Sequence, residues 1–334
     1  MKTKIAIRVD GNRKVGLGHV TRTLGFAQML TYNFDIIFYI DSIDDAVKAL
    51  LTSDSWHVKN ASCFFADLDK QTISVLDGYN FNKQFQLEVK SRSKKLVFID
   101  DMGGDDFVAD AVINHNANAI KMLNKSKVGT KFYLGLDYLL LRREFFANFP
   151  KMKEPSDSIK NIIVAIGGVD HNNYTYTVAE ALRGFLPDFR TTLLVSSSNP
   201  NIHTLERLGD GFVLASNKSA RELVEMYYDC DLLISSASMT AWEGCAVQVP
   251  LIVGTWASNQ IETARAIDEH GLGISLGDFS QGVYLLQQKF DYLVSHPQKK
   301  IEMMRRQKKL IDGHSPERIK TIMNELAAAR GGAN

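Results

Sequence analysis

The chain has few cysteines, no excess of charge of either sign and no long apolar run. Its 334 residues include three cysteines, which are scattered without C-x-x-C spacing: Cys63, Cys230 and Cys245. This pattern argues against a disulfide framework or a zinc site and indicates a reducing compartment, so we expect a cytoplasmic protein. The net charge of +1 offers no electrostatic case for nucleic acid or for an acidic membrane surface as a partner.

Segments that would place the chain in a membrane or a repeat class are also missing. No apolar stretch approaches the length of a transmembrane helix, and residues 1–4 lead directly into an expected strand rather than a signal peptide. There is no repeat of solenoid period and no low-complexity tract. A chain of this length is long for one core, so we expect two domains and no membrane partner.

Short apolar runs alternate with helical stretches in both halves of the chain. The apolar runs lie at 5–9, 35–40, 73–77, 95–100 and 111–114, and again at 161–168, 191–195, 231–235 and 250–253. Nearly fully apolar strands separated by helices indicate parallel sheets that are covered on both faces. Helices are expected at 174–184, 219–228, 240–247 and 260–270, and in the charged last forty residues, where Pro297 and Pro316 mark the expected helix starts.

A polar stretch with two prolines at 149–157 separates the two halves and is typical of a linker. The expected fold class is α/β, with two doubly wound Rossmann-like domains that face a cleft. The expected boundaries are 1–152 for the first domain and 158–315 for the second, followed by a C-terminal helix at 316–334.

The segment Gly16-Leu17-Gly18-His19-Val20-Thr21-Arg22 lies between an expected strand and an expected helix. Its glycines let the backbone approach an anionic ligand, and a helix N-terminus presents unpaired amides. A histidine there exchanges protons near neutral pH. The pattern departs from the nucleotide fingerprint G-x-G-x-x-G, because His19 and Arg22 follow the second glycine. Alone, it fits either chemistry beside an anion or a capped helix start with an incidental histidine.

Polar residues end three other strands of the first half: Asp77-Gly78-Tyr79, Asp100-Asp101 and Asn114-His115-Asn116. In open α/β sheets ligands bind at the carboxyl ends of the strands, so these residues are expected to form one polar edge. Two adjacent acids suggest a metal site, but no matching His or Cys ligands accompany them. We expect no metal and no cofactor, with magnesium held partly by phosphates as the alternative.

In the second half a buried strand ends at Ser235, and a helix is expected to begin near Ser238. Ser238 is a sound N-cap, and the free amides of Ser238, Met239 and Thr240 suit a diphosphate. Glu243 lies about one turn inside this helix, where a carboxylate accepts both hydroxyls of a ribose. The alternative for Glu243 is a capping box.

Two further loops of the second half are candidates for ligand contact. Gly167-Gly168-Val169-Asp170 follows the first strand of this domain, and its glycines permit either close ligand approach or a plain strand-to-helix turn. Asn259-Gln260 follows another strand. Its paired amides suit sugar hydroxyls, although Asn also caps helices.

Taken in register, these motifs resemble the UDP-sugar hydrolases of pseudaminic acid biosynthesis, which act on UDP-2,4-diacetamido-2,4,6-trideoxy-β-L-altropyranose. The resemblance spans nearly the whole chain, to about residue 275. It rests in the first half on Arg8-x-Asp10, Gly16-x-Gly18-His19-x-x-Arg22, Asp77-x-Tyr79, Phe98-Ile99-Asp100-Asp101, Ala109-Asp110-x-Val112-Ile113-Asn114 and Leu134–Arg142. In the second half it rests on Gly167-Gly168-x-Asp170, Ala237–Glu243 and Asn259-Gln260.

The resemblance implies a GT-B fold, related to two-Rossmann-domain glycosyltransferases such as the lipid II GlcNAc transferase. It implies that the second domain binds UDP, that the first contacts the sugar, and that the last helix crosses back to the first domain. His19 matches the catalytic histidine of the family, and Tyr79, the second candidate catalytic residue, matches a tyrosine beside the sugar. The remaining motif residues are candidates for substrate binding: Asp10, Gly16, Gly18, Arg22, Asp77, Asp101, Asn114, Gly167, Gly168, Asp170, Ser238, Met239, Thr240, Glu243, Asn259 and Gln260.

The implied reaction is hydrolysis of the anomeric C1–O bond, with His19 as general base toward water and UDP as the leaving group. The implied partner is a small-molecule UDP-sugar, with the enzyme working as a monomer. The alternatives are a GT-B glycosyltransferase that moves a UDP-linked amino sugar to an acceptor, a hydrolysing 2-epimerase, and a nucleotide-sugar binding protein without turnover.

Overall fold

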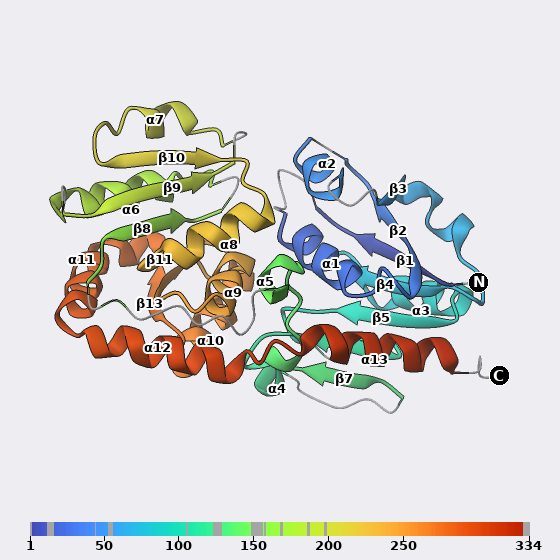
Figure 1. Cartoon of the computed structure of the whole chain (residues 1–334). Helices are drawn as coiled ribbons and strands as arrows, with labels where there is room; N and C mark the ends of the chain where they lie inside the picture. The colour runs from blue at the N-terminus through green and yellow to red at the C-terminus, as the bar shows by residue number, and fades with distance from the viewer. Residues whose placement is uncertain are drawn as a thin grey trace. The chain divides into compact units, whose positions relative to one another are not determined.

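The computed structural model describes residues 2–11, 17–43, 45–52, 56–104, 106–122, 129–147, 156, 158–167, 170–185, 188–196 and 199–329. These residues form two compact units. The first contains residues 1–143 together with 314–334, and the second contains residues 144–313. Most helices and strands of both are labelled in Figure 1.

The first unit is built on a seven-stranded parallel sheet in the order β3-β2-β1-β4-β5-β6-β7. Its strands are β1 (Thr3–Val9), β2 (Phe34–Ile40), β3 (His57–Asn60), β4 (Ile73–Asp77), β5 (Lys95–Ile99), β6 (Ala111–Asn114) and β7 (Lys131–Leu134). Its helices are α1 (Gly18–Gln28), α2 (Asp45–Thr52), α3 (Lys83–Arg92), α4 (Ala119–Met122) and α13 (Ser315–Ala328).

The second unit is built on a six-stranded parallel sheet in the order β10-β9-β8-β11-β12-β13. Its strands are β8 (Asn161–Ala165), β9 (Arg190–Val195), β10 (Phe212–Ser216), β11 (Leu232–Ser236), β12 (Leu251–Thr255) and β13 (Ile274–Asp278). Its helices are α5 (Glu144–Ala147), α6 (Tyr174–Leu182), α7 (Ile202–Glu206), α8 (Ala220–Asp229), α9 (Met239–Ala246), α10 (Ile261–Glu269), α11 (Phe279–Ser295) and α12 (Pro297–Leu310).

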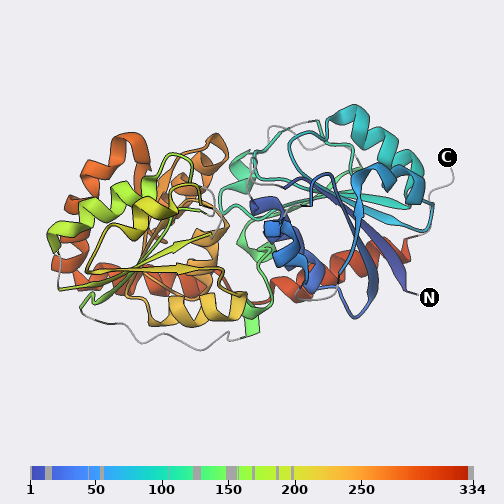
Figure 2. The same cartoon turned by 90° about the horizontal axis from the view of Figure 1, so that it is seen from above.

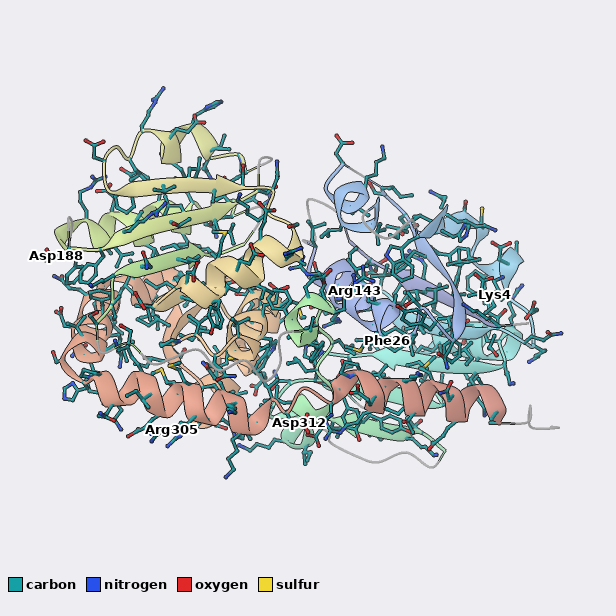
Figure 3. All side chains as sticks on the ribbon, in the orientation of Figure 1. Lys4, Phe26, Arg143, Asp188, Arg305 and Asp312 are labelled. Carbon is teal, nitrogen blue, oxygen red and sulfur yellow. The ribbon has the colours of Figure 1, made fainter. Side chains whose placement is uncertain are left out.

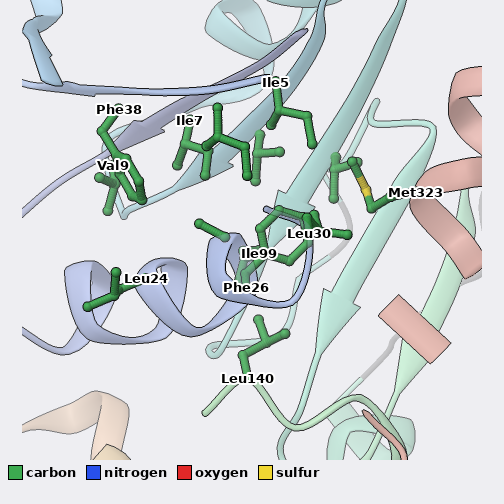
Figure 4. Packing of buried hydrophobic residues seen from close by; sticks show 14 of the residues in the cluster. Ile5, Ile7, Val9, Leu24, Phe26, Leu30, Phe38, Ile99, Leu140 and Met323 are labelled. Carbon is green, nitrogen blue, oxygen red and sulfur yellow. The ribbon is translucent and has the colours of Figure 1, made fainter. Parts of the chain in front are cut away.

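Both faces of each sheet are covered, as the apolar strand runs predict. Along β1, Ile5, Ile7 and Val9 face one core cluster while Ala6 belongs to another, because successive side chains point to opposite faces. The first cluster lies under α1 and α13, and the second under α3 (Figures 2 and 4). Phe26 of α1, which is labelled in Figure 3, is fully buried in the first unit. The predicted pair of doubly wound parallel sheets is confirmed.

Helix α1, which carries His19, lies unusually close to a neighbouring extended segment. A Cβ atom on Gly25 would lie 2.6 Å from both the carbonyl carbon and the carbonyl oxygen of Leu141. Real Cβ atoms do not approach backbone so closely, so a glycine is required for this packing. The position of α1 against the first unit is therefore set by backbone contact as well as by its apolar face.

The chain passes between the two units at a different place from the predicted boundary. Helix α5 was assigned to the first domain, yet it packs against α8 and α9 of the second unit. Phe145 is buried there, with its ring 6.4 Å from that of Tyr227. Burial of this aromatic ring places the boundary after Arg143. Within the described part of the chain, no helix combines the length and apolar character that crossing a bilayer requires.

The last helix, α13, completes the core of the first unit. Ile319, Ile322, Met323 and Leu326 are buried in the cluster that β1 and α1 form. At its start the Ser315 hydroxyl donates to the Leu139 carbonyl oxygen at 2.8 Å. A helix from the end of the chain thus closes one face of the N-terminal sheet.

This packing predicts that Ile319→Ala destabilises the first unit. Truncation of a fully buried Ile costs about 2–5 kcal/mol in free energy of unfolding, through lost burial and a residual cavity. Lys320→Ala is the matched control, because Lys320 is exposed on the same helix and its loss should stay within about 0.5 kcal/mol. Urea unfolding followed by circular dichroism measures both, and equal effects would contradict the placement of α13 in the core.

Candidate functional site

The candidate residues of the first unit meet where its strand order reverses. The chain leaves β1 toward β2 on one side and later returns to β4 on the other, so β1 and β4 flank the switch point. Val9 pairs with Asp77, and the amide of Asp10 donates to the Asp77 carbonyl oxygen at 3.1 Å. Ligands of open α/β sheets bind at the carboxyl ends of strands at such a point.

His19 and Asp77 form a buried pair at this switch point. His19 lies in the first turn of α1, and its Nδ1 lies 2.7 Å from Oδ1 of Asp77, a carboxylate with no exposed side-chain surface. A carboxylate only accepts hydrogen bonds, so Nδ1 carries the proton and donates. This tautomer leaves Nε2 as an acceptor, the state that a general base requires.

Arg22 joins Asp77 to a second carboxylate. Its Nε donates to Asp77 Oδ2 at 2.7 Å and its Nη1 to Asp101 Oδ2 at 2.6 Å, while Nη2 also contacts Asp77 Oδ1. Nη2 lies 2.9 Å from His19 Nδ1 as well. Since Nδ1 already donates to Asp77, this last contact brings two donors together rather than forming a hydrogen bond. Arg22 is therefore a clamp between two acids.

Burial and charge act against each other in this cluster. Burial alone would raise the pKa of Asp77, but the positive charge of Arg22, the His19 imidazole and the hydrogen bonds from both outweigh it, and the pKa lies below its usual value. Burial likewise opposes the charge on Arg22, yet Asp101 and Asp77 hold its pKa above the usual value. Both groups stay ionised, because each compensates the other.

Tyr79 is the half-exposed member of the group. Its side chain follows β4, and its ring meets the His19 ring edge-on, with centroids 4.6 Å apart and an interplanar angle of 77°. Its hydroxyl donates to Asp101 Oδ2 at 3.1 Å. Tyr79 therefore contacts both the imidazole and the second acid that Arg22 holds.

Asp100 and Asn114 support the loop that carries Asp101. The Asp100 carboxylate accepts from the amides of Met102 and Gly103 and from Asn114 Nδ2. Burial and the adjacent Asp101 charge raise its pKa above the usual value, although these hydrogen bonds oppose the shift. The Asn114 side chain is buried, and its Oδ1 accepts from the Asn116 amide. Asn114, a predicted substrate contact, thus has both side-chain ends occupied within the unit.

His115 was not among the predicted site residues, although the sequence pattern contains it beside Asn114. It is 5% exposed, and its Nδ1 is sealed from solvent with no hydrogen-bond partner among the described residues. Burial and the nearby Arg22 charge lower its pKa to about 4, so it is neutral near pH 7. In the described part of the chain no group of three or more His, Cys, Asp or Glu side chains is arranged to hold a metal ion.

The Arg8-x-Asp10 motif is an ion pair at the end of β1. Arg8 Nη1 lies 3.0 Å from Asp10 Oδ1, and Asn80 Nδ2 donates to Asp10 Oδ2 at 3.4 Å. Arg8 also pairs with Asp41, and its guanidinium lies over the Phe81 ring at 5.2 Å. Asp10, predicted to bind substrate, therefore has protein partners at both oxygens. The spacing of two residues along a strand was the available signal for this pair.

In the glycine loop, Gly18 opens α1 with an exposed backbone, and an added Cβ there would meet no atom of the described residues within 4 Å. This open space fits the predicted approach of a ligand to the backbone. The other predicted glycine of the loop, Gly16, lies outside the described residues.

The second unit has its own switch point between β8 and β11. After β8, Gly167 has φ +143°, a conformation that favours glycine, whereas Gly168 lies outside the described residues. Asp170 is buried and caps α6, because its Oδ1 and Oδ2 accept from the amides of Tyr174 and Thr175 at 2.9 and 2.7 Å. The amides at the start of α6 therefore donate to a carboxylate of the protein itself.

Helix α9, which follows β11 at the same switch point, has a different N-terminus. Ser238 occupies the N-cap position but does not cap the helix with its side chain, because its hydroxyl lies 2.9 Å from that of Ser236. The first turn, with Met239 and Thr240, contains no acidic residue. The positive end of the helix dipole and the first-turn amides are therefore not compensated by a carboxylate in the first turn of this helix.

Glu243 is the fifth residue of α9 and is 4% exposed. A capping box needs its acid at the third helical position, which Ala241 occupies, so that alternative for Glu243 is excluded.

Asn259 and Gln260 lie in a short 3₁₀ helix, Ser258–Gln260, after β12. The buried Gln260 side chain accepts from the amide of Trp256 at 2.9 Å and thereby holds the loop, whereas Asn259 is partly exposed. Each unit therefore gathers its own polar group at the carboxyl edge of its sheet. His19, Arg22, Asp77, Tyr79 and Asp101 are in mutual contact in the first unit, and the second unit has Gly167, Ser238–Thr240, Asn259 and Gln260 on loops after β8, β11 and β12.

Searches against known proteins find relatives of low identity. No family model matches the chain. The uncharacterized protein MJ1062 of Methanocaldococcus jannaschii is 27% identical over 267 residues, which are 75% of this chain and 55% of that protein, so the chain matches about half of its length. The spore coat polysaccharide biosynthesis protein SpsG of Bacillus subtilis is 23% identical over 344 aligned residues, covering 96% of this chain and 98% of that protein.

A third relative is the UDP-2,4-diacetamido-2,4,6-trideoxy-β-L-altropyranose hydrolase of Campylobacter jejuni. It is 23% identical over 286 residues, covering 80% of this chain and 97% of that protein.

Solved structures resemble the chain over nearly its whole length. MurG of Acinetobacter baumannii has a TM-score of 0.66 at 13% identity, covering 96% of this chain and 99% of the other. The calicheamicin glycosyltransferase CalG4 has a TM-score of 0.64 at 12% identity, covering 99% and 100%. A UDP-N-acetylglucosamine 2-epimerase has a TM-score of 0.62 at 12% identity, covering 100% and 99%. The predicted GT-B fold, two Rossmann-like units with parallel sheets of seven and six strands, is confirmed.

Proposed function

We propose that this chain is a UDP-sugar hydrolase that cleaves the anomeric C1–O bond of UDP-2,4-diacetamido-2,4,6-trideoxy-β-L-altropyranose. The observation that carries the proposal is the His19–Asp77 pair at the switch point of the first unit, with Nε2 left to accept a proton. The sequence similarity to the hydrolase of Campylobacter jejuni supports the choice of substrate. In this proposal the first unit acts on the sugar and the second binds UDP.

The proposed reaction consumes one water molecule. His19 Nε2 accepts a proton from water as the water oxygen attacks C1, and Asp77 holds the imidazole orientation and stabilises the imidazolium that forms. The C1–O bond breaks, and its electron pair leaves with the diphosphate of UDP. The products are UDP and the free sugar, and the proton on His19 returns to solvent. Tyr79, beside the imidazole and half-exposed, is proposed to contact the sugar.

The second unit is proposed to stabilise the leaving group. The first turn of α9 carries the positive end of the helix dipole and contains no acid, whereas Asp170 accepts from the amides of α6. The Ser238 amide, predicted to be free, donates to the Ser236 carbonyl oxygen at 2.8 Å, so the amides proposed for the diphosphate are those of Met239 and Thr240. Negative charge grows on the diphosphate as the C1–O bond breaks, and oriented amides stabilise such charge. We assign diphosphate binding to Met239 and Thr240, ribose binding to Glu243, and further nucleotide-sugar contacts to Gly167, Asn259 and Gln260.

A GT-B glycosyltransferase is the second candidate, because solved glycosyltransferases have the same fold. Fold alone does not separate the two activities, since one fold supports many reactions. The difference lies in the acceptor, which is water for a hydrolase and another molecule for a transferase.

The first prediction is that the purified chain releases UDP from the UDP-diacetamido sugar with no acceptor present. NMR of the sugar product identifies the reaction, because hydrolysis retains the configuration at C2 and a hydrolysing 2-epimerase inverts it. UDP release that requires an added acceptor would favour the transferase. Absence of release with any of a panel of UDP-diacetamido sugars, with or without acceptors, would contradict the proposal.

The second prediction concerns His19→Gln. Loss of the base should lower kcat for UDP release by about 10²–10⁴-fold, the usual contribution of general acid–base catalysis. The affinity for UDP, measured by isothermal titration calorimetry, should change little, because UDP binding is assigned to the second unit. His203→Gln is the control, since His203 lies on α7 with its side chain 85% exposed. Equal turnover in His19→Gln and the wild type would remove His19 from the mechanism.

The third prediction concerns Glu243→Gln. A hydrogen bond to a charged group contributes about 1.5–3 kcal/mol, so loss of the carboxylate should raise the Kd for UDP by about 10–100-fold. At saturating substrate kcat should be retained. Glu225→Gln serves as the control, because Glu225 lies on α8 and its side chain and that of its partner, Arg221, are both exposed. A variant that binds UDP normally but turns over slowly when saturated would assign Glu243 a different role.

A further inference from the structure

The contacts of Arg22 and Asp101 point to a role other than substrate binding. Arg22 is 4% exposed, and three of its nitrogens are directed at two carboxylates of the protein. The side chain of Asp101 is 23% exposed, and its Oδ2 accepts from both Arg22 and Tyr79. A sugar would have to compete with buried, charge-assisted hydrogen bonds to reach either group.

The contacts also close into a ring. His19 donates to Asp77, Arg22 joins Asp77 to Asp101, Asp101 accepts from the Tyr79 hydroxyl, and the Tyr79 ring packs against the His19 ring. The two residues proposed to act on substrate, His19 and Tyr79, are therefore held by the same guanidinium. One side of the ring orients the imidazole, and the other orients the tyrosine.

We propose that Arg22 and Asp101 are positioning residues that set the charge state and orientation of His19 and Tyr79, and that neither is a substrate ligand. This assignment rests on the proposed function for its catalytic meaning. Arg22 orients Asp77 toward Nδ1, but its own positive charge, 2.9 Å from Nδ1, opposes a second positive charge on the imidazole. Asp101 offsets that charge, so that the attraction between Asp77 and the imidazolium prevails.

Other titratable groups near His19 do not replace this pair. Asp10, at the end of β1, is paired with Arg8. Asp100 faces the Asp101 loop and Asn114. His115, at the end of β6, is neutral above pH 5, because burial lowers its pKa to about 4. Among the described residues, the charged groups in direct contact with His19 are therefore Arg22 and Asp77, and Asp101 binds the far side of Arg22.

The proposal predicts opposite effects of removing the two charges. Arg22→Gln removes the cation beside Nδ1, so proton uptake by His19 should move to higher pH. Asp101→Asn removes the anion that offsets Arg22, so proton uptake should move to lower pH. A charge within about 4–6 Å shifts a neighbouring pKa by about 1–3 units, so each displacement should be about one pH unit. Arg22→Lys keeps the charge and should displace the midpoint less than Arg22→Gln does.

The measurement is an NMR titration of the His19 imidazole in ¹⁵N-histidine-labelled protein without substrate, with His19→Gln identifying the signal. Arg221→Gln is the matched control, because Arg221 lies on α8 of the second unit with its side chain 85% exposed. Circular dichroism checks that each variant is folded. If Arg22→Gln fails to fold, Asp101→Asn carries the test alone, since its side chain is partly exposed and the replacement is isosteric.

Kinetics supply the second readout. The low-pH limb of the kcat profile should move in the same direction as the NMR midpoint. The losses of kcat in Tyr79→Phe and in Asp101→Asn should be less than additive in the double variant, because both substitutions break the same hydrogen bond. Unmoved NMR midpoints together with a raised KM would overturn the proposal and return Arg22 and Asp101 to substrate binding. Displaced midpoints without UDP-sugar turnover would support the positioning role of Arg22 and Asp101 and contradict the proposed hydrolase activity. The failures of the two proposals are therefore distinguishable.

Discussion

The first unit depends on the buried carboxylate of Asp77. It has no exposed side-chain surface, and such a charge persists in a protein interior only when it is paired and fully hydrogen-bonded. Arg22 supplies two of its contacts and His19 a third, so this fully buried carboxylate also fixes the orientation of the His19 imidazole. Asp77 lies at the end of β4, and the parallel sheet thereby determines where the imidazole of α1 is held.

At the same edge of the sheet, a second set of polar residues hydrogen-bonds to one another and to nearby backbone within the first unit. Asp100 holds the loop that carries Asp101, Asn114 holds Asp100, and the Asn114 oxygen holds the backbone beyond β6. A site has to be positioned closely to act on a substrate, and hydrogen bonds behind the contact residues provide that rigidity. Several polar residues that a motif marks as substrate contacts thus serve the geometry of their neighbours.

Much of the fold could be predicted from the sequence, because short, nearly fully apolar runs such as Ile73–Asp77 and Asn161–Ala165 indicate buried parallel strands in a chain that alternates them with helices. The short strands β3 and β7 and the more exposed β10 were not predicted, since four or five partly exposed residues have little periodicity. Proline did mark the starts of α12 and α13, because its fixed φ suits the first helical turn. That α13 fills the first unit's core depends on tertiary packing, which local pattern does not contain.

The sequence identifies polar residues that lie together in the first unit, but it does not identify what each of them does there. Strand ends placed His19, Asp77 and Asp101 at one edge, but the sequence does not say which polar atoms pair with one another. Asp170 illustrates the difference, because the motif that marks it as a ligand contact equally suits the helix cap that it forms. For Glu243 the structure excludes the capping box, since helix α9 begins at Met239 and its third residue is Ala241.

The charge balance around His19 explains why one arginine needs two acids. In the proposed reaction the imidazole takes a proton from water and becomes a cation between a carboxylate at 2.7 Å and a guanidinium nitrogen at 2.9 Å from the same Nδ1. With Asp77 alone these two charges would largely cancel, and the imidazole would gain little by accepting the proton. Asp101 contributes a second negative charge to the cluster and binds the far side of Arg22. One guanidinium against two carboxylates leaves a net negative charge, and that excess favours the imidazolium at the moment when base catalysis requires it.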